Sequence, residues 1–339
     1  MKAMAITSFG KPLEMITIED PIPNSGEVVL SVLACGVCHT DLGIIAGTSP
    51  SSRKVNLPLI PGHEILGIVE DVGPGVEGWK VGDKALVYIY VGCGSCLACQ
   101  LGYDSGCSNR RYTLGFNANG GYAEKVKVPA HNLFRVSSVI PDENMATVTC
   151  AMGTATHAVI ERAKVQPGDR VLVVGAGGVG NLVAQLALWS GGYTIVADID
   201  EAKLALAQEV GVHETYNVSG SSELPASVKV NKIIEVSGAI SEWDWLFNTL
   251  DNDGTIVVVG HSPDLSLSIR TRKLTSGQFE IKGSRAYSRA NLLSAINLAE
   301  SGKIKPLIGS AYPLSKANEV LSKLATNRLG GTRAVLVPR

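Results

Sequence analysis

Four cysteines gather in one short glycine-rich segment of the sequence, GCGSCLACQLGYDSGC. Cys93, Cys96, Cys99 and Cys107 follow a C-x2-C-x2-C-x7-C spacing and make up most of the seven cysteines in the chain. Tetrahedral zinc binds four thiolate sulfurs at roughly 2.3 Å, and one loop of this spacing supplies all four, which leaves no position open for a substrate. The segment therefore predicts a closed, structural zinc site. An iron–sulfur cluster is the main alternative, and four unligated core cysteines are another.

Three other segments carry a second set of candidate metal ligands. The stretch CGVCHTD holds Cys35 and Cys38, PGHE holds His63, and Cys150 stands far along the chain in TVTCAMGTAT. Taken singly, the C-x-x-C could be a redox pair and the histidine an ordinary buried side chain. One cysteine of the C-x-x-C, the histidine and Cys150 together offer two cysteines and a histidine. This is the ligand set of a catalytic zinc whose fourth position is open to a substrate.

A glycine-rich turn, VLVVGAGGVG, indicates where a dinucleotide would bind. An apolar run leads into G-x-G-x-x-G and then into the helical pattern NLVAQLALW, and the next apolar run ends in Asp198, about twenty residues further on. The glycines let the pyrophosphate approach the helix N-terminus, where free N–H groups attract anions, and Asp198 would hydrogen-bond the adenosine ribose. The loop positions expected to bind the cofactor are Gly175, Gly177, Gly178, Val179 and Gly180.

The charges that follow the second apolar run favour NAD over NADP. Asp198, Asp200 and Glu201 lie close together in the sequence, and no arginine follows them directly. The 2′-phosphate of NADP would therefore meet repulsion instead of a partner. The alternative is a glycine-rich strand–helix turn that binds nothing.

The elements that must position these residues form two different patterns. From residue 171 to 283, apolar runs alternate with helix-period segments, which predicts a Rossmann-type parallel sheet in an α/β fold. The expected strands are 171–174, 194–197, 232–236, 255–259 and 279–283, with a short strand near Tyr216. Before about residue 150, short β-branched runs separated by glycine and proline predict a β-rich domain. Two later segments, 288–306 and 314–325, have helical patterns.

Composition limits the kind of partner that the protein binds. The chain has 339 residues, of which 45% are hydrophobic, and a formal net charge of -1. This length suggests two domains, and the balanced charge argues against nucleic acid or an anionic membrane and favours a small molecule. The first residues show no secretory h-region and no apolar run approaches the ~18 residues of a membrane span, so we expect a cytoplasmic protein. In a reducing cytoplasm, clustered cysteines favour metal binding over disulfides, and the odd total of seven cysteines argues further against a complete disulfide set.

The order of these motifs resembles that of a known family. CGVCHTD, PGHEILGIVEDVG, the four-cysteine loop and VVGAGGVG follow one another as in the zinc-dependent medium-chain alcohol dehydrogenases, most closely those of the microbial type, and the resemblance spans essentially the whole chain. It implies a GroES-like catalytic domain at 1–151 and 286–339, with a Rossmann NAD-binding domain at 152–285. It also implies two zinc ions per chain, one catalytic and one structural, and a homodimer or homotetramer.

The same resemblance implies roles for individual side chains around the catalytic zinc. The metal ligands that it implies are Cys38, His63 and Cys150, with Glu64 beside the metal, either outside the ligand set or as a transient ligand. Cys35 is then a packing cysteine. Asp41 is expected to accept a hydrogen bond from the free ring nitrogen of His63 and so to fix the histidine's tautomer.

Further side chains are implied for the cofactor. The resemblance places His39 and Arg333 near the pyrophosphate, Lys203 beside the adenosine ribose, and Thr154 and Ser237 near the nicotinamide. The alternative for Lys203 and Arg333 is that they are solvated surface charges. All of these residues are expected to bind NAD together with the glycine-rich loop.

The reaction that the resemblance implies is reversible hydride transfer between NAD and a primary or secondary alcohol, giving an aldehyde or a ketone. Zinc acts as a Lewis acid on the substrate oxygen, and Thr40 would pass the proton between that oxygen and the cofactor ribose. Many family members carry a histidine shortly afterwards to complete this relay, where this chain has Gly43. The alternatives are a polyol or other secondary-alcohol dehydrogenase of the same family, and a non-catalytic binding protein on this fold.

Overall fold

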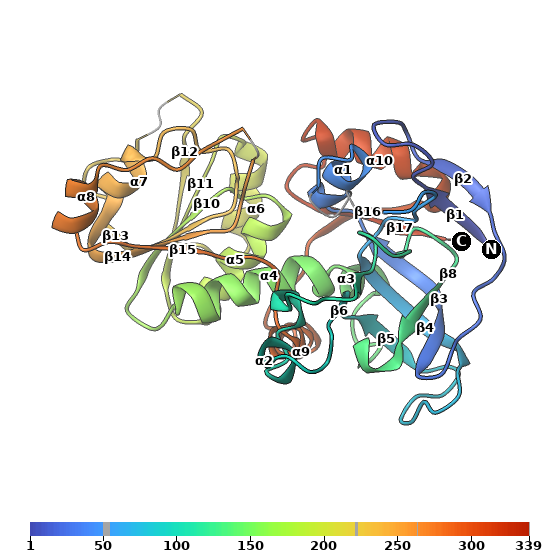
Figure 1. Cartoon of the computed structure of the whole chain (residues 1–339). Coiled ribbons are helices and arrows are strands. Elements are labelled where there is room, and N and C mark those ends of the chain that lie inside the picture. The colour runs from blue at the N-terminus through green and yellow to red at the C-terminus, as the bar shows by residue number, and fades with distance from the viewer. Residues whose placement is uncertain (50–54, 221–222, 263, 339) are drawn as a thin grey trace. The chain divides into compact units, whose positions relative to one another are not determined.

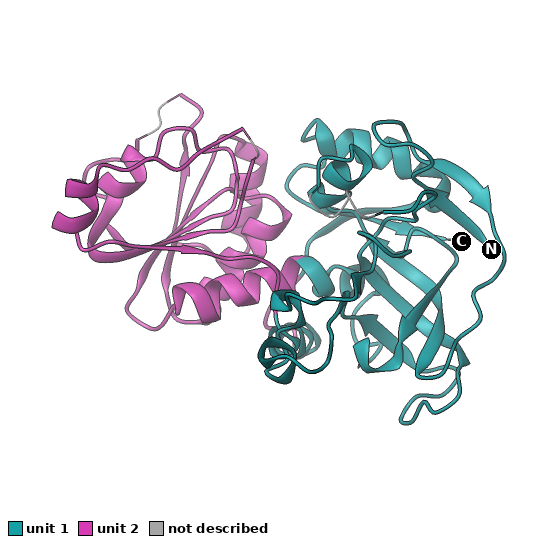
Figure 2. Cartoon of the chain, viewed as in Figure 1, with its two compact units in different colours: residues 1–150, 288–301, 306–339 teal, residues 151–287, 302–305 magenta. Residues whose placement is uncertain are grey.

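The computed structural model describes residues 1–49, 55–220, 223–262 and 264–338 (Figure 1). The chain forms two compact units (Figure 2), of which unit 1 combines residues 1–150, 288–301 and 306–339, and unit 2 combines residues 151–287 and 302–305. Each unit contains its own sheet and its own hydrophobic core. Among the described residues, no helix combines the length and the apolar character needed to cross a membrane.

Unit 1 is β-rich, as the sequence predicts, and its largest element is a seven-stranded sheet in the order β16-β17-β3-β4-β5-β9, with β8 also paired to β3. The strands of unit 1 are β1 Lys2–Ala5, β2 Glu14–Thr17, β3 Glu27–Gly36, β4 Glu64–Val72, β5 Lys84–Val87, β6 Tyr90–Val91, β7 Tyr112–Thr113, β8 Lys125–Pro129, β9 Leu133–Arg135, β16 Ile308–Pro313 and β17 Arg333–Val337. The helical segments are α1 His39–Ile45, α2 Leu97–Gln100, η2 Asp104–Gly106, η3 Ala130–Asn132, α3 Asp142–Ala146, α9 Arg289–Glu300, η6 Leu314–Lys316 and α10 Ala317–Ala325. The two predicted helical patterns near the C-terminus contain α9 and α10.

The strand β3 organises unit 1 because three other strands pair with it. Its sequence, EVVLSVLACG, is rich in β-branched and apolar residues, and most of them are buried. It runs antiparallel to β4, with Gly36 opposite Glu64, and antiparallel to β17, with Cys35 opposite Leu336. The end of β3, the start of β4 and the start of β17 therefore lie together at one edge of the sheet.

Unit 2 contains the predicted Rossmann-type sheet. Its six strands are all parallel, in the order β12-β11-β10-β13-β14-β15. The strands are β10 Arg170–Val174, β11 Tyr193–Asp198, β12 Glu214–Asn217, β13 Val230–Glu235, β14 Leu250–Val258 and β15 Glu280–Gly283. The helices are α4 Gly153–Thr156, α5 Gly178–Trp189, α6 Glu201–Glu209, α7 Asp244–Thr249 and α8 Thr271–Ser276, together with the π-helices η4 Val148–Met152, which begins in unit 1, and η5 His157–Ala163. The strand order reverses between β10 and β13, and at such a point the carboxyl ends of parallel strands form a ligand crevice.

One predicted strand begins at the wrong place. The sequence predicts a strand from residue 255, whereas β14 begins at Leu250. The segment DNDG at 251–254 has the composition of a turn, and Asp253 has a left-handed φ of 61°. The strand nevertheless continues through this irregularity, because Val230 pairs with Leu250 and Lys232 pairs with Thr255 across a register shift. A local bulge of this kind is hidden from a pattern that looks only for alternation.

We expect Gly36→Ala to destabilise unit 1. A Cβ at Gly36 would lie 1.9 Å from Oε2 and 2.9 Å from Cβ of the fully buried Glu64. Overpacking of this kind lowers the free energy of unfolding by about 1–3 kcal/mol, which urea denaturation would measure. The matched control is Gly43→Ala, because an added Cβ there meets only Thr48 Oγ1 at 3.6 Å. This variant should be as stable as the wild type or slightly more stable, and equal effects of the two changes would contradict the close packing at Gly36.

Candidate active site and metal centres

The second predicted ligand set comes together at the strand ends of unit 1. Cys38 follows β3 and forms the N-cap of α1, His63 immediately precedes β4, and Cys150 lies in the π-helix η4. The possible ligand atoms of Cys38, His63, Glu64 and Cys150 all lie within 4.8 Å of one another. The antiparallel pairing of β3 with β4 produces this proximity, because it places the exit of one strand beside the entrance of the other.

His63 is oriented by a carboxylate on one side and has a free nitrogen on the other. Its Nδ1 lies 3.0 Å from Asp41 Oδ1, which confirms the predicted hydrogen bond, and both side chains are buried. Its Nε2 is also buried and has no hydrogen-bond partner among the described residues. Buried polar atoms are nearly always paired, so an unpaired nitrogen within a cluster of thiols and a carboxylate fits a metal ligand.

The charges in the cluster favour a thiolate at Cys38. The pKa of Cys38 is well below its usual value because Cys150 donates a hydrogen bond to it and because His63 and Arg333 add positive charge, although burial opposes the shift. The same hydrogen bond and burial raise the pKa of Cys150. A thiolate is the form of cysteine that binds metal, so the site already favours a ligating sulfur.

Glu64 and Arg333 form a buried ion pair beside this cluster. Arg333 donates through one guanidinium nitrogen to Glu64 Oε1, and burial raises the pKa of Glu64 to about 7 although Arg333 opposes the shift. Glu64 Oε2 is buried and has no hydrogen-bond partner among the described residues. One carboxylate oxygen is therefore held by Arg333 while the other remains available to the ligand cluster.

The two predicted cofactor cations are not surface charges. Arg333 and Lys203 are each only 7% exposed, so the alternative that they are solvated surface charges is wrong for both. Lys203 Nζ lies 4.0 Å from Asp200 Oδ2 at the start of α6. Their predicted contacts with the pyrophosphate and the ribose stay predictions, as does that of His39 at the start of α1.

The four cysteines of the first segment have the geometry of a single-ion site. Their Sγ atoms are separated by 3.6 Å between Cys96 and Cys99, 3.7 Å between Cys96 and Cys107, and 4.0 Å between Cys93 and Cys99. A tetrahedron with metal–sulfur bonds of roughly 2.3 Å has edges of roughly 3.8 Å, so one zinc ion fits among them. All four are free cysteines, and their separations are far longer than the roughly 2.0 Å of a disulfide.

The four-cysteine loop is anchored by a residue from a distant part of the chain. Arg289, at the start of α9, donates through Nε to Asp104 Oδ2 at 2.7 Å, and its backbone N–H donates to Gly102 O at 2.8 Å. The sequence analysis missed this pair. No sequence signal could have found it, because the two side chains are separated by 185 positions along the chain.

In unit 2 the glycine-rich turn joins β10 to α5, as the motif predicts. Gly175 follows β10 with a φ of 98°, which strongly favours glycine, and Gly177 is the N-cap of α5. Asp198 ends β11 and accepts hydrogen bonds from the backbone N–H of Ala176 at 2.6 Å and of Asp200 at 3.0 Å. The carboxylate predicted to bind the ribose therefore lies against the loop predicted to bind the pyrophosphate.

The two residues predicted near the nicotinamide lie in different elements of unit 2. Thr154 is half-buried in α4, and Ser237 follows β13, where its hydroxyl donates to the buried Glu235 Oε1 at 2.5 Å. Burial raises the pKa of Glu235, although Ser237 opposes the shift. The sequence analysis did not single out Glu235, because a lone carboxylate at a strand end carries no motif.

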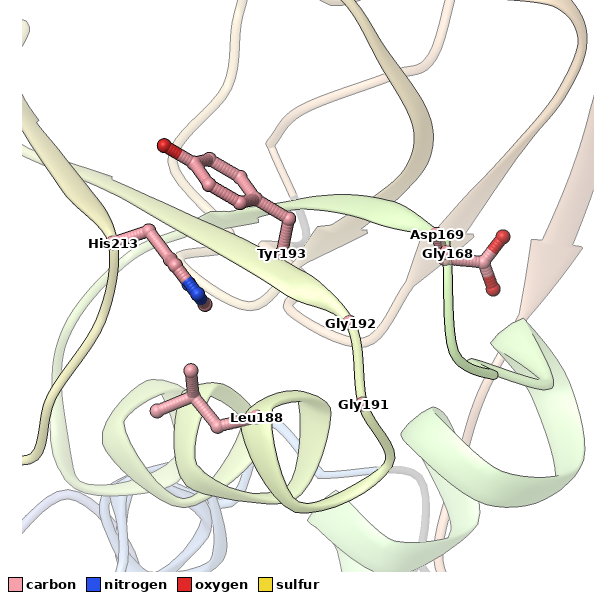
Figure 3. Close-up of a pocket in the computed structure, with 7 residues that line it drawn as sticks. All are labelled: Gly168, Asp169, Leu188, Gly191, Gly192, Tyr193 and His213. Carbon is pink, nitrogen blue, oxygen red and sulfur yellow. The ribbon is translucent and has the colours of Figure 1, made fainter.

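A separate pocket of about 290 Å³ opens in unit 2 at the amino ends of the strands (Figure 3). The Tyr193 and His213 rings stack there with centroids 4.1 Å apart, and Gly191 and Gly192 form its wall. The glycine-rich turn follows the carboxyl end of β10, which is the opposite end of the sheet. The pocket is therefore not the predicted dinucleotide site.

Both the sequence and the structure are similar to known dehydrogenases. Residues 24–138 match the family model for an alcohol dehydrogenase GroES-like domain, and residues 178–301 match the model for a zinc-binding dehydrogenase. An alcohol dehydrogenase of Geobacillus stearothermophilus is 33% identical over 98% of this chain and 97% of its own length. A solved NAD-dependent alcohol dehydrogenase superposes with a TM-score of 0.93 at 30% identity and covers 100% of both chains. An acryloyl-coenzyme A reductase of Sulfurisphaera tokodaii is 28% identical over 94% of this chain and 95% of its own length.

The chain belongs to the zinc-containing medium-chain alcohol dehydrogenase family, whose members include the microbial alcohol dehydrogenases named above. It is accordingly a medium-chain zinc dehydrogenase and an NAD(P)-dependent oxidoreductase. Its two ligand clusters suggest two zinc ions. Because the relatives include a protein named acryloyl-coenzyme A reductase, membership of the family does not by itself specify the substrate.

We expect the purified protein to contain two zinc ions per chain that respond differently to mutation. Cys96→Ser removes one ligand of the closed site, so the variant should lose one zinc and unfold at a lower temperature, since its exposed loop has no other core. Cys150→Ser should lose the other zinc and all activity but keep the wild-type melting temperature more closely. Elemental analysis and thermal denaturation would measure both. A wild-type content near one zinc, or a Cys96→Ser protein that keeps two, would contradict this assignment.

Proposed function

We propose that the protein is a zinc-dependent alcohol dehydrogenase, which transfers a hydride reversibly between a primary or secondary alcohol and NAD to give an aldehyde or a ketone. The observation that carries the proposal is the cluster of Cys38, His63, Glu64 and Cys150, in which His63 and Glu64 are buried and His63 Nε2 has no partner among the described residues. Two cysteines and a histidine leave one metal position for a substrate oxygen, unlike the closed four-cysteine site.

The chain's own residues then have separate tasks in this reaction. A zinc ion at this position would supply Lewis acidity to the alcohol or carbonyl oxygen. Cys38, His63 and Cys150 would hold the ion, and Arg333 would hold Glu64 through one carboxylate oxygen. The Thr40 hydroxyl lies 3.6 Å from Cys38 Sγ, so it borders the ligand cluster and would accept or return the proton of a substrate hydroxyl there.

Position 43 bears on the route by which the proton leaves. Gly43 lies inside α1, so no imidazole is present where many relatives complete the relay. The proton on Thr40 would then pass through the cofactor ribose to water. An added Cβ at this position meets only Thr48 Oγ1 at 3.6 Å, so the backbone accepts a side chain and the missing histidine can be restored experimentally.

Three observations support NAD as the cofactor. The glycine-rich turn has the expected strand–turn–helix context, Asp198 lies against it, and Asp200 and Glu201 add negative charge at the start of α6. Relatives of similar length are named NAD-dependent alcohol dehydrogenases. The proposal assigns residues 1–151 and 286–339 to the catalytic domain and 152–285 to the cofactor domain, while the homodimer or homotetramer and the cytoplasmic location stay predictions.

A substrate panel tests the proposed activity. Primary alcohols, secondary alcohols and polyols are each supplied with NAD, and formation of NADH is followed by its absorbance. In parallel, acryloyl-coenzyme A is supplied with NADH and with NADPH. The proposal predicts turnover of a simple alcohol that disappears on chelation. Turnover of polyols alone would favour the alternative within the family, and turnover of the thioester alone would overturn the proposal in favour of a reductase.

Replacing Asp198 should weaken the preference for NAD. The wild type should prefer NAD over NADP by about a hundredfold in kcat/KM, because a carboxylate at the ribose repels a 2′-phosphate. Asp198→Gly removes that charge, the hydrogen bond from Ala176 in the glycine-rich loop and the hydrogen bond from Asp200 at the start of α6. Asp198→Asn is the control, since it removes the charge and keeps an acceptor oxygen. If both variants keep the wild-type ratio of specificity constants, Asp198 does not contact the ribose.

Replacing Thr40 should slow the reaction without removing the metal. We expect Thr40→Ala to lower kcat by roughly a hundredfold, the scale of a positioned proton-transfer group, while zinc content stays at the wild-type level. Thr40→Ser keeps the hydroxyl and should remain active. Steady-state kinetics with parallel elemental analysis would measure both. A fully active Thr40→Ala enzyme would remove the relay from the mechanism.

A further inference from the structure

The carboxylate that orients His63 is itself held by a third side chain. Asp41 is fully buried, and its Oδ1 lies 3.0 Å from His63 Nδ1. Its Oδ2 accepts from the backbone N–H of Cys38 at 3.0 Å and from the hydroxyl of Tyr122 at 2.7 Å. Because Asp41 accepts these hydrogen bonds, His63 donates from Nδ1, and Nε2 is the ring nitrogen left for the ligand cluster.

Tyr122 is suited to a permanent donor role. Its side chain is fully buried, and burial together with Asp41 raises its pKa well above the usual value for tyrosine. The hydroxyl therefore keeps its proton and donates it to Asp41. A hydrogen bond to a buried charged acceptor is roughly twice as strong as one between neutral groups, so this contact restrains the carboxylate considerably.

The backbone fixes the position of the Tyr122 ring against the segment that carries His63. Gly120, Gly121 and Tyr122 donate backbone hydrogen bonds of 2.8, 2.9 and 3.0 Å to Ile60, Gly62 and Pro61 respectively. Gly62 has a φ of 92°, and a Cβ there would lie 2.3 Å from Tyr122 Cδ1. The residue before His63 is thus a glycine over which the tyrosine ring packs. The segment that carries His63 and the segment that carries Tyr122 are therefore held together by backbone hydrogen bonds.

We propose that Tyr122 is a positioning residue of the metal centre, which acts through Asp41 to hold His63 in the orientation that presents Nε2 to the metal. The proposal rests on the metal-binding part of the proposed function. Without the hydroxyl, Asp41 Oδ2 would keep, among the described residues, the hydrogen bond from the backbone N–H of Cys38, so the carboxylate and the imidazole would be less restrained. Loss of a partner that orients a metal ligand lowers metal affinity by about 10- to 100-fold. Tyr122 is one hydrogen bond further from the ligand than Asp41, so we expect its loss to have an effect at the lower end of this range.

The test measures zinc release from the holoenzyme to a coloured chelator. The wild type should release zinc in two phases, a fast one from the Cys38 cluster and a slow one from the four-cysteine site. Tyr122→Phe should speed the fast phase about tenfold and leave the slow phase unchanged. The matched control is Tyr88→Phe, because Tyr88 is equally buried in the same unit but its hydroxyl interacts with Ser105 and not with Asp41. This control should leave the fast phase at the wild-type rate.

Two further measurements distinguish positioning from general loosening of the fold. Cobalt(II) in the Cys38 cluster should show a shifted visible absorption spectrum in Tyr122→Phe. In an Asp41→Asn background, Tyr122→Phe should add almost nothing to the release rate, since the effects of residues that act as one unit are not additive. Tyr122→Leu, which also removes the donor, serves as the second variant and must accelerate the fast phase as well.

The outcomes separate this proposal from the proposed function. A folded Tyr122→Phe or Tyr122→Leu protein with the wild-type release rate and cobalt spectrum would overturn the role of Tyr122 alone. A full additive effect in the Asp41→Asn background would also overturn it, since the tyrosine would then act by another route. A wild-type protein that holds no zinc outside the four-cysteine site would instead contradict the proposed function.

Discussion

The pairing of Gly36 with Glu64 across β3 and β4 is the constraint on which the metal cluster depends. It places Cys38, just beyond the end of β3, beside His63, just before the start of β4. The same end of β3 pairs with β17, whose first residue is Arg333. The absence of a side chain at Gly36 leaves the space that the buried Glu64 carboxylate occupies. Three strand ends thus supply Cys38, His63, the Glu64 carboxylate and its counter-ion Arg333, while Cys150 comes from η4.

The two cysteine clusters solve different physical problems. The loop from Cys93 to Cys107 contains almost no buried apolar side chains, so a metal ion bound by the four cysteines would hold it together, and Arg289 and Asp104 attach it to α9. In the Cys38 cluster, hydrogen bonds instead link Cys38 and His63 to Asp41 and Glu64 to Arg333, and Tyr122 in turn donates to Asp41. The first cluster is closed by four sulfurs, while the second presents fewer sulfurs and an unpaired nitrogen. That difference is what permits chemistry at one site and stability at the other.

Local spacing made much of this arrangement predictable. The four cysteines and the glycine-rich turn are recognisable because their ligand atoms come from one short segment, and the hydrogen bond between Asp41 and His63 follows from the family pattern. The contacts of Tyr122 with Asp41 and of Arg289 with Asp104 join residues 81 and 185 positions apart, and nothing in their local sequence marks them. The burial of Lys203 and Arg333 could not be predicted from the sequence either, because lysine and arginine side chains are usually exposed. The early start of β14 was missed because DNDG has the composition of a turn.

Anomalous diffraction recorded on both sides of the zinc absorption edge, from crystals of the purified holoenzyme, tests the central claim most directly. The account predicts two peaks per chain. One should lie among the sulfurs of Cys93, Cys96, Cys99 and Cys107, and the other should be bound by Cys38 Sγ, His63 Nε2 and Cys150 Sγ at roughly 2.0–2.3 Å, with one further position for Glu64 or a substrate oxygen. A chain with a peak only at the four-cysteine loop, or with a second ion that His63 does not bind through Nε2, would contradict the account.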